Sequence, residues 1–190
     1  RFRISAFHQR DLVGMVIRVI PSKVSTIDEL QLPKILHSLC TNRRGLIVVT
    51  GAAGSGKTTT LAAMIDYRSQ QQGGHILTVE DPIEFIHSHK KSLVNQREVG
   101  FDTKSYGVAL KNAMREAPDV IMIGEIRDRE TMQHALAYAE TGHLCVSTLH
   151  ANNANQAMDR ILSFYPETAH KQVQMDLSLN LKAIVSQRLC

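Results

Sequence analysis

The chain has 190 residues, of which 43% are hydrophobic and 21% are charged, and its formal net charge is +4. This length holds one ordinary domain and part of a second, with enough apolar content for a buried core. No stretch approaches the roughly 18 to 20 apolar residues that span a bilayer, and no signal peptide is visible, so we expect a soluble, cytoplasmic protein. The positive charges are dispersed and do not by themselves indicate nucleic acid.

The N-terminal residues predict two β-strands, 1–5 and 15–20, joined by a polar turn that ends at Gly14. Two strands cannot bury a core on their own, so we expect residues 1–20 to be the end of a larger N-terminal domain. Residues 21–44 are predicted to be a linker, and its residues 27–41 are predicted to contain one short amphipathic helix.

From residue 45 onward, apolar runs alternate with helical patterns. Strands are expected at 45–50, 75–79, 120–123 and 144–149. Helices are expected at 57–71, 105–116, 129–140, 153–163 and 167–189, and the last has no stop signal, which suggests a domain (45–190) truncated at its C-terminus. The alternation predicts an α/β domain whose parallel sheet carries helices on both faces.

A glycine-rich loop directly follows the apolar run at 46–50, and it has every fixed position of a Walker A motif. Such a loop aims backbone N–H groups and a helix N-terminus at one phosphate group. Lys57 can then reach the β- and γ-phosphates, and the Thr58 hydroxyl can bind Mg²⁺. A plain strand-to-helix turn is the alternative that this context disfavours. The predicted nucleotide-binding residues are Gly51, Ala52, Ala53, Gly54, Ser55, Gly56, Lys57, Thr58 and Thr59.

Ionisable residues follow three of the predicted strands, and parallel strands deliver them to the same edge as the loop. They are Glu80 with Asp81 and Glu84, then Glu125, then His150. Glu80 leaves its strand first, so we expect it to orient and deprotonate the attacking water. Glu125 stands where a Walker B acid helps to hold Mg²⁺, and His150 could sense the γ-phosphate.

Each of these assignments has a plainer alternative. The acids near residue 80 could form a solvated turn, Glu125 could complement a helix dipole, and His150 could satisfy a local hydrogen bond. Arg127 and Asp128 are interpreted as a solvated helix start. His143 begins the strand that His150 ends, about 20 Å away, and should not touch the same nucleotide.

The remaining histidines and the cysteines suggest no metal or disulfide site. His87 and His89 lie in a basic loop without matching ligands and are predicted to be surface residues. Cys40, Cys145 and Cys190 lack paired spacing and are predicted to be small core residues.

Four segments in this order and spacing resemble the type II and type IV secretion-system ATPase superfamily. In that family they are the Walker A motif, Asp box, Walker B motif and His box, here at 51–58, 78–85, 124–128 and 141–150. Residues 94–99 are similar to the twitching-motility retraction ATPases. Within these, the PilU-like branch is the better match, through residues 127–132, 149–157 and 176–181.

The resemblance implies a RecA-like P-loop core preceded by remnant strands of a PAS-like domain at 1–20. It also implies a hexameric ring that hydrolyses ATP with Mg²⁺ and drives type IV pilus retraction at the inner membrane face. Glu80 would be the catalytic acid, Glu125 would act at the metal, and Arg3 and Arg18 would reach the γ-phosphate. An inner-membrane platform protein and a PilT-like ATPase are candidate partners, and no nucleic acid is expected.

Three other functions stay open at this point. The chain could belong to a secretion or pilus-extension ATPase of the same superfamily. Its positive charge also allows a RecA-like DNA-handling protein, and the loop alone allows a nucleotide-binding module that does not hydrolyse.

Overall fold

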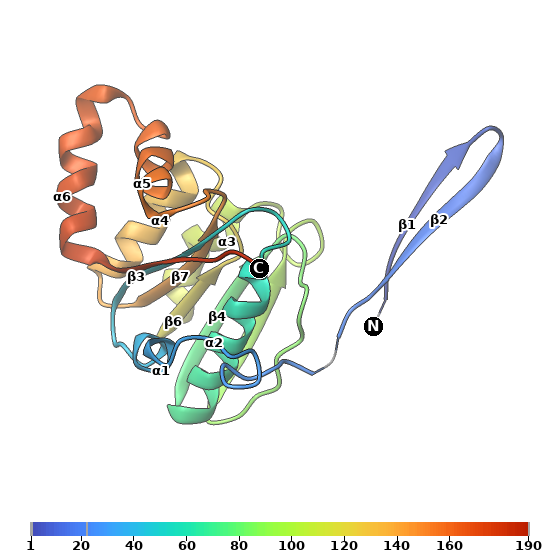
Figure 1. Ribbon diagram of the computed structural model, residues 1–190, viewed down its shortest axis with the longest axis horizontal. Coiled ribbons are helices and arrows are strands. Elements are labelled where there is room, and N and C mark those ends of the chain that lie inside the picture. Colours follow the sequence, from blue (N-terminus) through green and yellow to red (C-terminus); the bar gives the residue numbers. More distant parts are fainter. Residues whose placement is uncertain (1, 22, 190) are drawn as a thin grey trace.

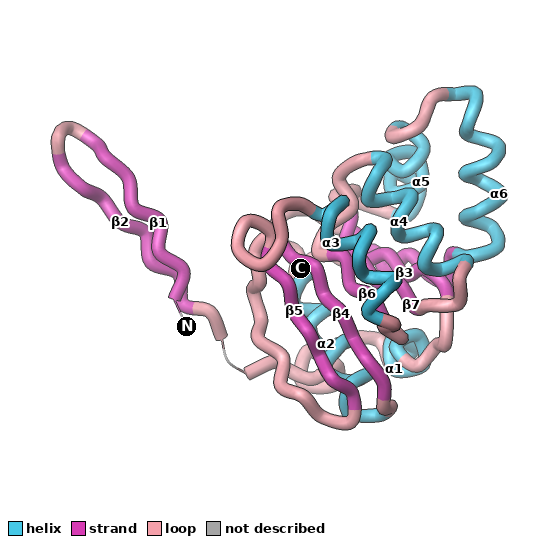
Figure 2. The backbone as a smooth tube through the Cα atoms, turned by 180° about the vertical axis from the view of Figure 1, so that it is seen from behind, coloured by secondary structure: helices cyan, strands magenta, loops and turns pink. Residues whose placement is uncertain are grey.

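The computed structural model describes residues 2–21 and 23–189 (Figure 1). It consists of an N-terminal hairpin that extends away from a layered α/β body (Figures 1 and 2). The hairpin strands are β1 (Phe2–Gln9) and β2 (Leu12–Val19), which pair antiparallel. Nearly all of their side chains are exposed.

The hairpin differs from the expected strands 1–5 and 15–20, because both strands continue to a two-residue turn. Arg10 and Asp11 form this turn with φ values of 48° and 59°, the left-handed conformation that matches strand twist in tight hairpins. Gly14 is therefore a strand residue and not the end of a turn. It lies opposite Phe7, whose ring would be only 2.8 Å from a Cβ at Gly14.

The body is built on a six-stranded sheet in the order β5-β4-β6-β7-β3-β8, and every neighbouring pair is parallel. Its central strands read as near-continuous apolar runs, as expected for strands covered on both faces. The strands are β3 (Gly45–Thr50), β4 (Gly74–Glu80), β5 (Ser92–Glu98), β6 (Val120–Ile123), β7 (Leu144–Leu149) and β8 (Leu181–Ser186). The predicted parallel sheet is confirmed.

Helices cover both faces of this sheet, again as predicted. One hydrophobic cluster packs α1 and α2 against it, and a second packs α3, α4, α5 and α6 on the opposite face (Figure 1). The helices are α1 (Ile35–Cys40), α2 (Lys57–Gln71), α3 (Tyr106–Ala113), α4 (Arg129–Glu140), α5 (Ala154–Ser163) and α6 (His170–Asn180). Short 3₁₀ turns lie at Met114–Glu116 and Glu167–Ala169.

The helix expected over 167–189 is wrong in its second half. Helix α6 ends at Asn180, and the next six residues form β8 beside β3. The reason is burial on both faces of the sheet: Ile184 packs on the α4 side, whereas Ala183 and Val185 pack on the α2 side. Such two-sided burial suits a strand with branched side chains.

Three smaller observations concern the outer elements. Strand β5 was not predicted, because only two of its seven residues, Leu93 and Val94, are apolar, and they are adjacent instead of alternating with polar residues. The short helix expected within residues 27–41 is α1, which begins two residues after Pro33. The helix expected over 105–116 tightens to a 3₁₀ turn at Met114 and ends at Ala117, which has a φ of 46°.

Cys40 and Cys145 are buried free thiols, so their assignment to the core is confirmed. Cys190 lies outside the described residues.

Candidate functional site

The loop between β3 and α2 has the shape of a phosphate-binding loop. Gly54 and Gly56 have φ values of 76° and 89°, a conformation that side chains other than hydrogen rarely allow. Lys57 opens α2, and its ammonium donates to the carbonyl oxygens of Gly51 at 3.0 Å and Ala52 at 2.9 Å. Burial lowers the pKa of Lys57, while the negative charges of Glu125 and Glu84 oppose that shift.

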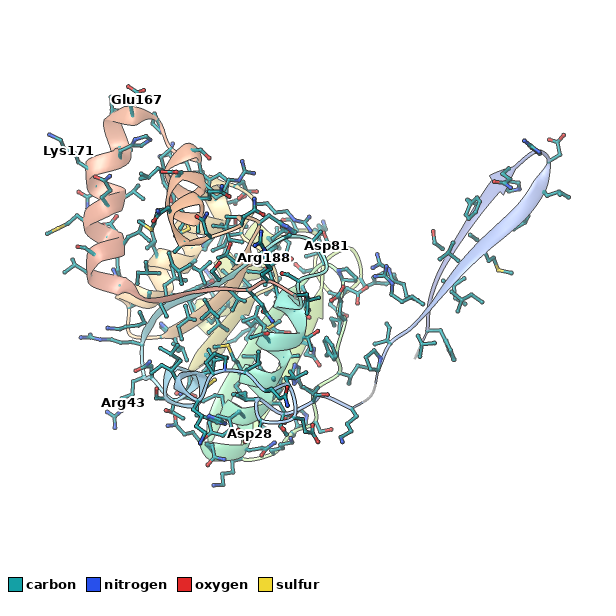
Figure 3. All side chains as sticks on the ribbon, viewed as in Figure 1. Asp28, Arg43, Asp81, Glu167, Lys171 and Arg188 are labelled. Atoms are coloured by element: carbon teal, nitrogen blue, oxygen red, sulfur yellow. The ribbon has the colours of Figure 1, made fainter. Side chains whose placement is uncertain are left out.

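A cavity of about 380 Å³ lies where the carboxyl ends of β4, β6 and β7 meet this loop. Asp81 and Arg188, both labelled in Figure 3, lie on this P-loop side of the sheet. The residues around the cavity are Ala53, Gly54, Gly56, Lys57, Thr58, Thr59, Leu61, Glu80, Asp81, Pro82, Glu84, Tyr106, Met122, Gly124, Glu125, Thr148 and His150.

Glu80 is the most buried acid of the cavity, with only 4% of its surface exposed. Its Oε1 atom accepts hydrogen bonds from Thr78 Oγ1 at 2.7 Å and from Gln96 Nε2 at 3.0 Å. Burial raises the pKa of Glu80, and the two hydrogen bonds partly counteract this effect. A raised pKa favours a carboxylate that accepts a proton during a reaction.

Glu125 follows β6 and stands close to the end of β4 because the residue before it is a glycine. Gly124 N–H donates to the Val79 carbonyl at 2.8 Å, and a Cβ at Gly124 would lie 3.3 Å from Glu80 Cα. The Glu125 carboxylate in turn accepts a hydrogen bond from Arg127 Nε at 2.9 Å. The glycine therefore brings the two acids to the same corner of the cavity.

His150 follows β7, the strand that separates β6 from β3. This order places it between the Walker B side and the phosphate loop, and its Nε2 atom is 3.3 Å from Glu125 Oε1. Thr148, at the end of the same strand, donates to the Gly124 carbonyl at 2.6 Å. His143 lies at the opposite end of β7 and does not line the cavity, as predicted.

Three loop residues predicted to bind nucleotide face other hollows. Gly51 and Ala52 line one beside α5, while Ser55 lines another formed with residues 187–189. Arg3 and Arg18 are paired across the hairpin and line a separate hollow of about 190 Å³. That hollow shares Thr59, Pro82 and Glu84 with the main cavity.

Several cavity neighbours were not singled out by sequence. Arg127, interpreted as a solvated residue, bridges Glu125 and Asp81, and its Nη1 is 3.1 Å from Asp81 Oδ2. The sequence feature that could have indicated this ion pair is the presence of opposite charges two residues apart, at Glu125 and Arg127. Tyr106 lies 6.0 Å beneath the same guanidinium, and nothing local in the sequence indicated it.

Gln187 was also missed, because it follows the unpredicted strand β8. Its N–H donates to the Thr50 carbonyl at 2.8 Å, and its side-chain oxygen accepts from Thr60 at 2.9 Å. Its backbone carbonyl also lies where a Cβ at Gly51 would stand. Gln187 thus makes hydrogen bonds to the residue before the phosphate loop and to the helix that follows it.

The surface assignment of His87 is wrong. Only 8% of the residue is exposed, and burial lowers its pKa to about 4. It lies near the ion pair between Lys90 and Asp66, whose atoms are 2.6 Å apart and which fastens the loop 81–91 to α2. His89 is exposed, as expected.

The oxygen atoms around the cavity suit Mg²⁺ held chiefly by a nucleotide. Within residues 2–21 and 23–189, no group of three or more His, Cys, Asp or Glu side chains is arranged to hold a metal. Mg²⁺ usually keeps several waters and takes one or two protein oxygens together with substrate phosphates. The Thr58 hydroxyl and the Glu125 carboxylate, both on the cavity wall, match that requirement.

The parallel sheet, the glycine loop and the acids at neighbouring strand ends define a P-loop nucleotide-binding protein with a RecA-like core. The chain belongs to the type II/IV secretion system protein family, whose model matches residues 1–190. None of the helices in the described ranges is long and apolar enough to cross a membrane.

Individual relatives narrow the comparison. The chain is 63% identical to the type IV pilus ATPase PilU of Pseudomonas aeruginosa over 100% of the chain and 50% of the relative. It is 49% identical to the type IV pilus retraction ATPase PilT of that organism, over 100% of the chain and 55% of the relative. The crystal structure of the pilus retraction motor PilT with bound ADP superposes with a TM-score of 0.96 at 50% identity. The superposition covers 99% of this chain and 55% of the PilT chain. The chain thus spans about half the length of these relatives.

Proposed function

We propose that the protein is an ATPase that works as a motor in type IV pilus retraction. The observation that carries the hydrolytic part is the buried Glu80 carboxylate, which shares one cavity with Lys57, Thr58 and Glu125. The 63% identity to a type IV pilus ATPase over the whole chain supports the pilus role.

In this proposal the phosphate loop and Lys57 bind the triphosphate. Lys57 exchanges its bonds to the Gly51 and Ala52 carbonyls for bonds to phosphate oxygens, which are stronger because both partners are charged. Thr58 and Glu125 would hold Mg²⁺, which would supply charge neutralisation at the phosphates.

Glu80 then activates water. Its carboxylate accepts a proton as the water oxygen bonds to the γ-phosphorus and the bond to the bridging oxygen breaks, releasing ADP and phosphate. The buried setting of Glu80 favours this step, because it disfavours the charged carboxylate relative to the protonated form. His150, beside Glu125, is proposed to report γ-phosphate occupancy.

The remaining parts of the proposal rest on the family resemblance of the sequence motifs. Residues 1–20 would belong to an N-terminal PAS-like domain, 21–44 to a linker and 45–190 to the ATPase domain. Arg3 and Arg18 would approach the γ-phosphate when the hairpin closes on the body, and their shared hollow with Thr59 and Glu84 is compatible with this. A hexamer at the cytoplasmic face of the inner membrane, working with a platform protein and a PilT-like ATPase, completes the proposal.

The test compares Glu80→Gln with Glu140→Gln in the full-length protein. Glu140 is exposed at the end of α4, so its variant controls for the loss of one negative charge. Glu80→Gln should bind ATP normally and lose turnover by about 100-fold or more, because a general base contributes that much. Normal turnover with intact binding would exclude Glu80 as the base.

The pilus role has its own readout. Cells that lack the gene should keep surface pili and lose twitching motility, because retraction fails while extension continues. Cells without pili would instead indicate an extension motor.

A further inference from the structure

Gln96 connects the Glu80 carboxylate to the loop that follows it. Its side-chain Nε2 donates to Glu80 Oε1 at 3.0 Å and to the Phe85 carbonyl at 2.9 Å. Its Oε1 accepts from the His87 N–H at 2.8 Å. Three of the four hydrogen bonds available to a glutamine amide are therefore made, and the side chain has one defined orientation.

The strand register explains why these groups meet. β4 and β5 pair so that Thr78 stands opposite Gln96. Residues two apart on one strand share a face, so Thr78 and Glu80 point to the side that α2 covers, and Gln96 joins them from β5. The loop 81–91 runs back along this side to reach β5, and its backbone passes Gln96 at residues 85–87.

Both side-chain donors, Thr78 and Gln96, reach the same oxygen of Glu80. Oε1 is thereby held by two side chains, and the backbone of Glu84 also donates a hydrogen bond to the carboxylate. A carboxylate fixed through one oxygen presents the other in a defined direction, which is what a base needs to meet a water molecule.

The loop that Gln96 holds also borders the nucleotide cavity. Pro82 and Glu84 line both the main cavity and the hollow that contains Arg3 and Arg18, and Phe85 lines the latter. A second anchor, from Ile83 N–H to Glu98 Oε2 at 3.2 Å, fixes the same loop to the end of β5. Gln96 therefore links the orientation of Glu80 to the position of this wall.

We propose that Gln96 is a positioning residue that orients Glu80 for water activation and holds it in register with the loop 81–91. The inference rests on the proposed function of Glu80 as the base. Gln96 itself does not line the cavity, so it would act through Glu80 and not by touching the nucleotide.

The first experiment measures steady-state ATP hydrolysis of Gln96→Leu in the full-length protein. Leucine keeps the bulk of the side chain and removes all three hydrogen bonds. We expect kcat to fall about 10- to 100-fold, the effect of losing a hydrogen bond to a charged group, while KM for ATP changes by less than about threefold because phosphate contacts are retained. Asn95→Leu is the matched control, since Asn95 is an exposed amide on the same strand that faces away.

A double-mutant cycle separates positioning from a structural effect. In a Glu80→Gln background, Gln96→Leu should cause no further loss of the residual turnover, because the residue through which it acts is already disabled. A kcat within about threefold of the wild type would overturn the proposal, and so would an additional loss in the Glu80→Gln background. If Glu80→Gln itself turned over normally, the proposed function would fail before this inference is reached.

A second variant keeps the test valid if Gln96→Leu does not fold, as judged by circular dichroism. Gln96→Glu retains the oxygen that accepts from His87 N–H and replaces the amide donor by a carboxylate facing Glu80. At neutral pH it should show the same drop in kcat and the same absence of effect in the Glu80→Gln background. Wild-type turnover by Gln96→Glu would contradict the proposal.

Discussion

Arg127 forms an ion pair with Glu125 of the cavity wall, with 2.9 Å between Arg127 Nε and Glu125 Oε2. The same guanidinium reaches Asp81 at 3.1 Å, so one cation joins acids from the ends of β6 and β4. The hydrogen bond and charge of Glu125 raise the pKa of Arg127, which stays protonated. A fixed positive charge therefore stands beside the carboxylate proposed to support Mg²⁺.

Replacing Arg127 should change the metal requirement. In Arg127→Gln the two carboxylates lose their cation, and Mg²⁺ is attracted more strongly. We expect the Mg²⁺ concentration for half-maximal ATP hydrolysis to fall about two- to fivefold, a modest effect because the site is partly exposed and screened. Arg115→Gln removes an equal charge from the exposed 3₁₀ turn and serves as the control. An unchanged or higher requirement would argue against Glu125 as a metal-side group.

Lys57 should matter for binding far more than for folding. Lys57→Ala removes a charged donor from the loop, and ATP affinity should fall about 10- to 100-fold, as measured with a fluorescent nucleotide. The thermal midpoint should change little, because the buried ammonium already carries a desolvation cost that lowers its pKa. Lys111→Ala, on the surface of α3, should bind ATP normally, and equal affinities for the two variants would contradict this assignment.

His87 should make the fold sensitive to acid. The pKa of His87 is lowered from 6.5 to about 4 by burial, so between these pH values the unfolded chain binds a proton that the folded chain does not. Stability is therefore fully present above pH 6.5 and falls by about 1.4 kcal/mol per pH unit as pH drops toward 4. Urea unfolding of His87→Leu should lose this slope.

The control for that measurement is His8→Leu on the exposed hairpin, which should keep the slope of the wild type. The comparison uses slopes and not absolute stabilities, because leucine also changes the packing at residue 87. Identical slopes for wild type and His87→Leu would contradict the lowered pKa of His87 in the folded chain.

Tyr138 anchors α4 to α3 through a hydrogen bond from its hydroxyl to the Leu110 carbonyl. The residue is 1% exposed, so Tyr138→Phe leaves that carbonyl without its partner inside the core. We expect a loss of about 1 to 2 kcal/mol in the free energy of unfolding. Tyr67→Phe is the control, because the Tyr67 hydroxyl makes no hydrogen bond among the described residues. Equal stabilities would show that water replaces the lost donor.

The central part of the fold could be predicted from sequence because its signals are local. The apolar runs at 45–50, 120–123 and 144–149 and the helices at 57–71 and 129–140 agree with the structure. The last strand could not be predicted, because the residues after Asn180 are mostly apolar and contain no Gly or Pro that would mark a turn. Only the pairing with β3 distinguishes a strand from a continued helix there.

The candidate site shows the same division. The strand-end rule predicted that Glu80, Glu125 and His150 gather near Lys57, and the four line one cavity. Gln96 could not be predicted, because its role depends on the register of an edge strand with no apolar signature. His87 was misjudged because it is buried beside Asp66 of α2, 21 positions earlier in the chain, a neighbour that the local sequence does not reveal.

Gln187, which follows β8, is hydrogen-bonded to residues on both sides of the phosphate loop. Its backbone N–H donates to the Thr50 carbonyl, and its side-chain oxygen accepts a hydrogen bond from Thr60 in the first turn of α2. If Gln187 moved, either these two hydrogen bonds would break or the loop would move with it. The residue that follows β8 is therefore tied to both ends of the loop that is proposed to bind the phosphates.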